Sequence, residues 1–351
     1  MIAKEYWKKF LNPQEKSCYD SIFRAAKLSQ ETVTIPDVSN ESFATVQRAV
    51  MEDHPELYNI PTMMQKEIRS VGVASFFGMQ KSTQINTRLI IRSIYTRNET
   101  VEINRSISQF FNELACIENS NALEKVSHVT AYLAENVKYD IDNFRNQNAA
   151  SALHYGVAQC SGYASAFKLA MDYLNVPCII VHGTAQSNPS TPGECEPHAW
   201  NIVEIDNQCY HIDPTSVSGA YSGRDSIPRI SRFLFSDDEA RGTYDWDVAK
   251  TPSCPSAHAI RNSMPFASSE FKGDMKEISS LSEISPLLDR ALEKHDGCKV
   301  VFKINTNVTG AKLMGYVRNT VSRYLSDRRL SVSVKINCIE NAFEITIPPK
   351  I

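Results

Sequence analysis

The spacing of apolar residues predicts helices and strands in the first 140 residues. Residues 42–52 place apolar side chains at helical spacing and stop before Pro55, whereas residues 84–97 alternate partly, as a strand does. Two amphipathic helices follow, because apolar residues recur every three or four positions: Ile103, Ile107, Phe110, Leu114 and Ile117 in the first, and Val126, Val129, Leu133 and Val137 in the second. We therefore expect a mixed helix-and-strand region over 1–100, followed by helices that pack on the next domain.

The last part of the chain has a pattern of its own. An apolar run at 299–304 precedes a helix that begins near 309, and two alternating segments follow at 330–336 and 343–347. The order strand, helix, strand, strand predicts a small two-layer β-α-β-β module over 296–351. The serine-rich residues of 252–295 are expected to be a linker.

The centre of the chain combines a helix with a hairpin. A helical pattern opens at Cys160 and carries Tyr163, Phe167, Ala170, Met171 and Leu174 on one face. Strands are expected at 178–181, 198–205 and 209–213. Asp206-Asn207, between the last two, is typical of a two-residue hairpin turn.

Cys160 has the position of a nucleophile. A thiol in the first turn of a helix lies near the positive end of the helix dipole and near unpaired backbone N–H groups, which favour the thiolate. The same N–H groups can hold the oxyanion of an acyl-transfer intermediate. The alternative is a buried structural cysteine, as expected for Cys178 and Cys209.

The hairpin register supplies partners for this thiol. If Ile205 pairs with Gln208, Asp213 lies opposite Trp200, and His198 is on the same face as both. His198 and Asp213 are then diagonal neighbours, roughly 7 Å apart at the backbone and within side-chain reach. In that geometry a carboxylate orients an imidazole for a nucleophile.

Composition narrows the class of protein. The 351 residues suggest two or three domains, and 37 basic against 40 acidic residues, a net charge of −3, disfavour a dedicated nucleic-acid binder. No apolar run approaches the ~20 residues of a membrane span, and no secretory signal is visible. The nine cysteines are odd in number and contain no Cys-x-x-Cys pair, so we expect reduced thiols in a soluble, cytoplasmic protein.

A metal site is the rival interpretation of the central segment. His182, Cys195, His198, His211 and Asp213 are possible ligands, but Cys195-x-x-His198 is the only short ligand spacing and has no matching second pair. A calcium-loop motif is also lacking. We therefore expect neither a metal nor a cofactor.

Several short blocks resemble the core of the bacterial transglutaminase-like superfamily. They are Tyr155-Gly156, Cys160-Ser161-Gly162-Tyr163-Ala164, His198-Ala199-Trp200-Asn201, Tyr210-His211-Ile212-Asp213-Pro214-Thr215 and the segment 232–239. The resemblance covers about 125–246. It implies a papain-like α+β fold with Cys160 as nucleophile, His198 as general base and then acid, and Asp213 as the orienting carboxylate. The superfamily contains protein-glutamine crosslinkers, cysteine proteases, peptide N-glycanases and inactive relatives.

Together these observations predict an α+β protein with a transglutaminase-like catalytic domain over 101–251, acting on an amide of a protein or peptide through a thioester. Residues expected to contact the substrate are Tyr155, Gln159, Tyr163 and Trp200. Thr215-Ser216 lacks the adjacent aromatic residue common in the superfamily, and a polar rim is expected over 186–197, so hydrolysis is favoured over transfer to an amine. The alternative is a catalytically inactive interaction scaffold that binds partner proteins. Substrate identity and oligomeric state stay open.

Overall fold

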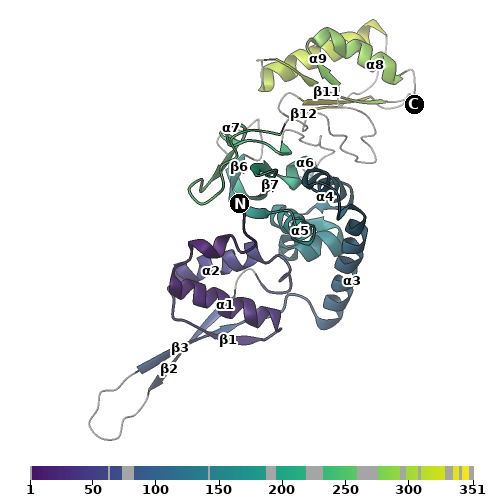
Figure 1. Ribbon diagram of the computed structural model, residues 1–351. Helices are drawn as coiled ribbons and strands as arrows, with labels where there is room; N and C mark the ends of the chain where they lie inside the picture. The colour runs from purple at the N-terminus through teal and green to yellow at the C-terminus, as the bar shows by residue number, and fades with distance from the viewer. Residues whose placement is uncertain are drawn as a thin grey trace, which may run out of the picture.

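The computed structural model describes residues 2–61, 64–72, 83–140, 143–186, 195–218, 232–258, 276–292, 298–306, 310–328, 335–339 and 342–347. Within them, Figure 1 shows three groups of elements in chain order, each built on a sheet. The mixed helix-and-strand composition is as predicted.

The N-terminal group packs two helices on a three-stranded antiparallel sheet. Its elements are η1 (Trp7–Phe10), α1 (Pro13–Lys27), β1 (Thr32–Ile35), α2 (Asn40–Asp53), β2 (Gln65–Gly72) and β3 (Thr83–Ile90), with strand order β1-β3-β2. Helix α2 matches the predicted segment, whereas strand β3 covers only the first part of the strand predicted over 84–97 and ends at Ile90. Helix α1 was not predicted, although its start carries a full capping box between Asn12 and Glu15, with Pro13 at the first helical position.

The central group holds the predicted helix and hairpin. Helices α3 (Arg97–Leu114) and α4 (Ala122–Asn136) pack with α5 (Cys160–Tyr173), which in turn packs on strands β6 (Cys178–Gln186) and β7 (Cys195–Ile205). The sheet order is β8-β7-β6-β9, where β8 is Gln208–Ile212 and β9 is Tyr244–Trp246. The shorter elements are η2 (Ala115–Ile117), β4 (Lys138–Tyr139), η3 (Phe144–Gln147), η4 (Ser151–Tyr155), β5 (Val157–Ala158), α6 (Pro214–Val217) and α7 (Asp237–Ala240).

The predicted hairpin register is confirmed. Ile205 pairs with Gln208, and Asp206 and Asn207 have φ values of 51° and 62°, the left-handed conformation that a two-residue turn of this kind requires. Strand β8 ends at Ile212, and Asp213 becomes the N-cap of α6.

The C-terminal sheet is larger than the predicted module. Strand β11 (Cys298–Ile304), helix α9 (Gly310–Asp327), and strands β12 (Lys335–Ile339) and β13 (Ala342–Ile347) follow the expected order. Strand β10 (Lys276–Ile278), η8 (Leu281–Glu283) and helix α8 (Ile284–Leu292) lie in the segment expected to be a linker. That expectation is corrected: β10 pairs in parallel with β11, and Ile284 and Leu288 are fully buried in the same core, so the folded unit begins by Lys276. Residues 330–334 of the predicted strand lie outside the described ranges.

The first residues of the chain pack on the central sheet as well as on their own group. The backbone N–H of Ile2 donates to Glu204 at 2.7 Å, and the Trp7 indole donates to the Ile180 carbonyl at 3.0 Å. The N-terminal group is thereby held beside β6. Across the described ranges, no helix combines the length and the apolar character that crossing a bilayer would require.

Candidate active site

Cys160 is the first residue of α5, as predicted. Its N-cap, Gln159, has an extended backbone and makes no side-chain cap to the helix. The thiol is partly buried and packs against a small cluster formed by Ala164, Ile180 and Ala199. The sulfur is therefore held between the start of a helix and the central sheet, next to the helix's first N–H groups.

His198 links this thiol to Asp213. Its Nε2 lies 2.8 Å from Oδ2 of Asp213, and the ring is close enough to Cys160 to lower the pKa of the thiol. Because Nε2 faces the carboxylate, Nδ1 is the ring nitrogen available to act on the thiol. The three side chains that the sequence placed together are thus in contact.

Asp213 is fully buried, and its carboxylate is held by donors on both oxygens. Besides His198, Oδ2 accepts from the Ser216 hydroxyl and from the Tyr244 hydroxyl, each at 2.7 Å, while the Ser216 backbone N–H donates to Oδ1 at 3.1 Å. Burial opposes its ionisation, but the charge of His198 and these hydrogen bonds hold the pKa of Asp213 well below its usual range. The group therefore carries a negative charge at neutral pH.

The charges of the two other groups are coupled to this one. Burial opposes ionisation of the thiol, but the hydrogen bond and charge of His198 and the Ala199 N–H together lower the pKa of Cys160. Burial likewise disfavours the imidazolium, yet Asp213 and Cys160 raise the pKa of His198 to about 10. The site consequently favours a thiolate–imidazolium pair, the reactive form of a cysteine nucleophile.

Two of the predicted substrate contacts are wrong. Tyr163 is fully buried, and its hydroxyl donates to the Val137 carbonyl. Trp200 is also fully buried and stacks on the His198 ring, with centroids 6.0 Å apart. Helical and strand periodicity point both side chains into the core, so neither has surface to offer a substrate.

The other two predicted contacts are at least partly accessible. Tyr155 is 43% exposed and stacks on Tyr95. Gln159 is partly buried, and its amide contacts Gln147 at 3.2 Å. Of the expected rim, residues 187–194 lie outside the described ranges. The described end of the rim, Cys195 to Pro197, is exposed.

Sequence reasoning missed Ser216, Tyr244 and Tyr139. The signal for Ser216 was present, because Asp213-Pro214-Thr215-Ser216 is a helix start with its cap and first-turn proline. Nothing in the sequence near Tyr244 pointed to the site, because Tyr244 belongs to β9 and reaches the site when β9 pairs with β6. That pairing needs a glycine at position 183, since a Cβ on Gly183 would lie 2.1 Å from the Asp245 carbonyl oxygen. Burial, together with the charges of Cys160, Glu196 and Asp213, raises the pKa of Tyr139.

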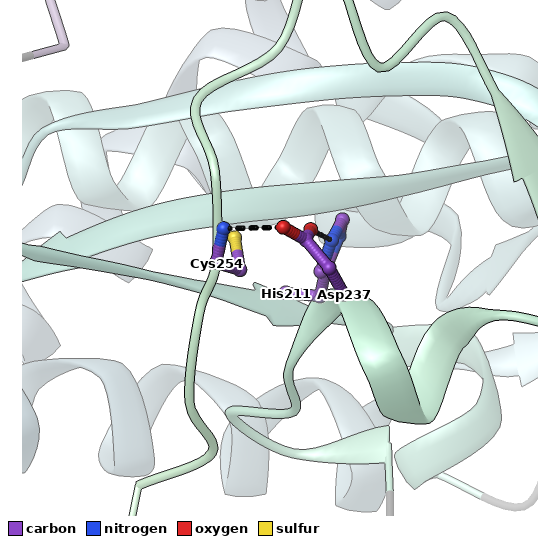
Figure 2. A group of neighbouring side chains, drawn as sticks. All are labelled: His211, Asp237 and Cys254. Carbon is purple, nitrogen blue, oxygen red and sulfur yellow. Dashed lines mark hydrogen bonds and ion pairs between the residues drawn. The ribbon is translucent and has the colours of Figure 1, made fainter.

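The candidate metal ligands that lie together in the described residues differ from the set that the sequence suggested. In Figure 2, His211, Asp237 and Cys254 come from β8, the start of α7 and a loop, and their candidate ligand atoms lie within 4.8 Å of one another. The ligand set considered from the sequence does not form one cluster: His198 and Asp213 pair with each other, whereas His182 pairs with Glu52 and His211 with Asp237.

The hydrogen bonds of this cluster do not fit a metal. The Trp200 indole donates to His211 Nδ1 at 3.0 Å, so the proton of the ring is on Nε2, which faces Asp237 at 2.9 Å. A metal on Nε2 would require the other tautomer, with two donors facing each other. Burial also raises the pKa of Cys254, which opposes the thiolate that a metal needs. The cluster instead fixes Trp200 behind the His198 ring.

Part of the chain that contains this site is similar to a known protein family. Residues 108–214 match the model of the transglutaminase-like superfamily. The chain carries a transglutaminase-like domain. Cys160, His198 and Asp213 all lie inside the matched segment of this domain, whereas Tyr244 and the N-terminal group lie outside it.

Solved structures similar to this chain include one described as a TGase, with 15% identity, a TM-score of 0.29, and coverage of 43% of this chain and 44% of that one. A putative cysteine protease from Cytophaga hutchinsonii has 12% identity, a TM-score of 0.27, and coverage of 44% and 64%. The periplasmic domain of TgpA from Pseudomonas aeruginosa has 16% identity, a TM-score of 0.25, and coverage of 38% and 56%. The chain thus spans less than two thirds of each of these structures. No curated protein matches the sequence.

Proposed function

We propose that this protein catalyses cysteine-dependent acyl transfer on an amide of a protein or peptide, through a thioester formed on Cys160. The observation that carries the proposal is the contact chain from the Cys160 thiol through His198 to the buried carboxylate of Asp213. The match to the transglutaminase-like superfamily supports the same chemistry. A helix that presents its first residue to a sheet-borne histidine also supports a papain-like layout of the domain.

The first half of the reaction makes the thioester. The thiolate of Cys160 attacks the amide carbonyl, forming a C–S bond and placing a negative charge on the carbonyl oxygen. Backbone N–H groups at the start of α5, with the Gln159 carboxamide beside them, are the donors for this oxyanion. As the C–N bond breaks, His198 gives its Nδ1 proton to the leaving nitrogen, which departs as an amine or ammonia.

The second half releases the acyl group. Neutral His198 takes a proton from water, the resulting hydroxide attacks the thioester carbonyl, and the C–S bond breaks to give a carboxylic acid. The Cys160 thiolate is restored, and His198 keeps the proton as imidazolium. Asp213 orients the ring and stabilises its charge throughout.

Water is the acceptor that the surroundings favour. A crosslinking site must exclude water, and aromatic walls are the usual means. Here Trp200 and Tyr163 are buried behind the triad instead of over it, and the described rim at Cys195, Glu196 and Pro197 is exposed. Water, at ~55 M, then needs no binding site of its own.

The test compares the Cys160→Ala variant with Cys195→Ala, which removes an exposed cysteine from the same rim. Each protein is incubated with a glutamine-containing protein and a labelled primary amine, and new chain termini, ammonia and incorporated label are measured. Hydrolysis products that need Cys160 but not Cys195 support the proposal. Cys160-dependent incorporation of the amine would reverse the choice of water and keep the triad. If no product depends on Cys160, and if Cys160 is alkylated no faster than Cys195, the proposal is wrong and the protein is an inactive interaction scaffold.

A further inference from the structure

A cavity of about 460 Å³ separates the N-terminal group from α5. One wall is the side of α2, which lies outside the segment that matches the superfamily. The other walls are α5, strand β6 and the short segment from Gln147 to Ala149. Besides Gln147, Asn148 and Ala149, the residues that line the cavity are Ala44, Gln47, Arg48, Met51, Glu52, Pro55, Tyr58, Met64, Ser161, Ser165, Ile180 and His182.

Two lining residues of this cavity are neighbours of the proposed nucleophile. Ser161 follows Cys160 directly on α5, and Ile180 belongs to the cluster against which Cys160 packs. A substrate whose amide reaches the thiol therefore has its neighbouring residue beside the cavity.

The lining is mainly apolar, and its polar groups are arranged around that surface. Met51, Pro55, Tyr58 and Met64 form the apolar side contributed by the N-terminal group. Nδ1 of His182 lies 2.6 Å from Oε1 of Glu52, and the other charged side chain of the lining is Arg48, which is exposed on α2. A binding surface of this kind suits an uncharged, bulky side chain.

One polar group in the lining lacks a partner in the chain. Gln47 is 8% exposed, and its Nε2 has no hydrogen-bond partner among the described residues. Buried amides are normally hydrogen-bonded, so this N–H group beside a cavity is available to an acceptor that a ligand carries.

We propose that this cavity binds the peptide segment next to the attacked amide, with a bulky apolar side chain against Met51 and Met64 and a peptide carbonyl accepting from Gln47. The volume exceeds that of one side chain and accommodates about two residues. This inference rests on the proposed function, since it takes the amide at Cys160 as its reference point. It makes the N-terminal group a determinant of substrate choice.

The experiment measures second-order rate constants for inactivation by benzyloxycarbonyl-Phe-Ala fluoromethyl ketone, acetyl-Ala-Ala fluoromethyl ketone and iodoacetamide. The Ala44→Trp variant fills the cavity from an exposed position of α2, and Gln47→Leu removes only the amide. Glu41→Trp is the matched control, because Glu41 is exposed on the same helix, one turn away, and does not line the cavity.

In the unmodified protein we expect the Phe probe to react about tenfold or more faster than the Ala probe. Ala44→Trp should abolish that preference and Gln47→Leu should reduce it several-fold, while iodoacetamide rates and melting temperatures stay within the range of Glu41→Trp. Equal rates for the two peptidyl probes, or a loss in Ala44→Trp that iodoacetamide shares, would overturn the inference.

Failure of the proposed function gives a different result. In that case no probe modifies Cys160 faster than Cys195. Binding of the unreactive benzyloxycarbonyl-Phe-Ala amide, followed by calorimetry, then still tests the cavity: binding that Ala44→Trp abolishes supports it, and no binding refutes it.

Discussion

Replacing Tyr244 with phenylalanine removes one hydroxyl from the buried carboxylate of Asp213 and leaves the ring in place. The ring packs against Trp200, with centroids 5.0 Å apart, so the change is nearly one of hydrogen bonding alone. The lost bond is 2.7 Å long and its acceptor is ionised and inaccessible to water. A hydrogen bond to a charged group contributes about 1.5–3 kcal/mol, and we expect Tyr244→Phe to lower the free energy of unfolding by that amount.

The assay is urea unfolding at pH 7. Tyr210→Phe is the control, because that hydroxyl donates to the neutral, exposed amide oxygen of Gln208 and should cost at most about 1 kcal/mol. In an Asp213→Asn background, Tyr244→Phe should cost only about 0.5–1.5 kcal/mol, since the acceptor is then uncharged. Equal losses for Tyr244→Phe and Tyr210→Phe, or no coupling between Tyr244 and Asp213, would refute the view that donors around Asp213 keep it ionised.

Four further outcomes follow from the same contacts. Alkylation of Cys160 should already be fast well below pH 9, because His198 lowers the pKa of the thiol. The rate of acyl transfer should fall as the pH rises through the His198 pKa of about 10, because the proton for the leaving nitrogen is then lost. A single rise near pH 9 in both rates would contradict this expectation. Gly183→Ala should displace β9, since the new Cβ meets the Asp245 carbonyl, and should lower both stability and Cys160 reactivity, whereas Gly315→Ala, inside helix α9 with open space around it, should raise stability by about 0.5–1 kcal/mol and leave Cys160 reactivity unchanged. Asp206→Val should cost about 1–2 kcal/mol in urea unfolding because its φ is 51°, and a neutral result would mean that the turn relaxes freely. Zn²⁺ should leave the melting temperature unchanged, because Trp200 fixes the tautomer of His211; a clear rise lost in Cys254→Ala would reverse the assignment of that cluster.

Much of the site was readable from the sequence because its information is local. The spacing that starts a helix at Cys160 and the Asp206-Asn207 turn are properties of short segments, and a two-residue turn fixes the register of its strands. That register places the end of β8 beside β7. Asp213 follows the last paired residue, Ile212, and reaches His198 as the N-cap of α6.

The local sequence pattern could not predict which aromatic side chains near the triad are buried. Tyr163 and Trp200 lie near the triad in sequence and in space, but only the packed structure shows that they face inward, away from a substrate. The segment 252–295 likewise looked like a linker, because the partner of β10 is β11, more than twenty residues further along the chain.

The sequence by itself determined the nucleophile's place at the start of a helix and the alignment of His198 with Asp213, since each depends on contacts within a helix or a hairpin. The tertiary structure alone decided which groups complete the site. Tyr244 reaches Asp213 through the pairing of β9 with β6, and α2 lies beside α5 across a cavity. Those contacts join segments 31 residues apart in one case and more than a hundred in the other, and no local periodicity encodes them.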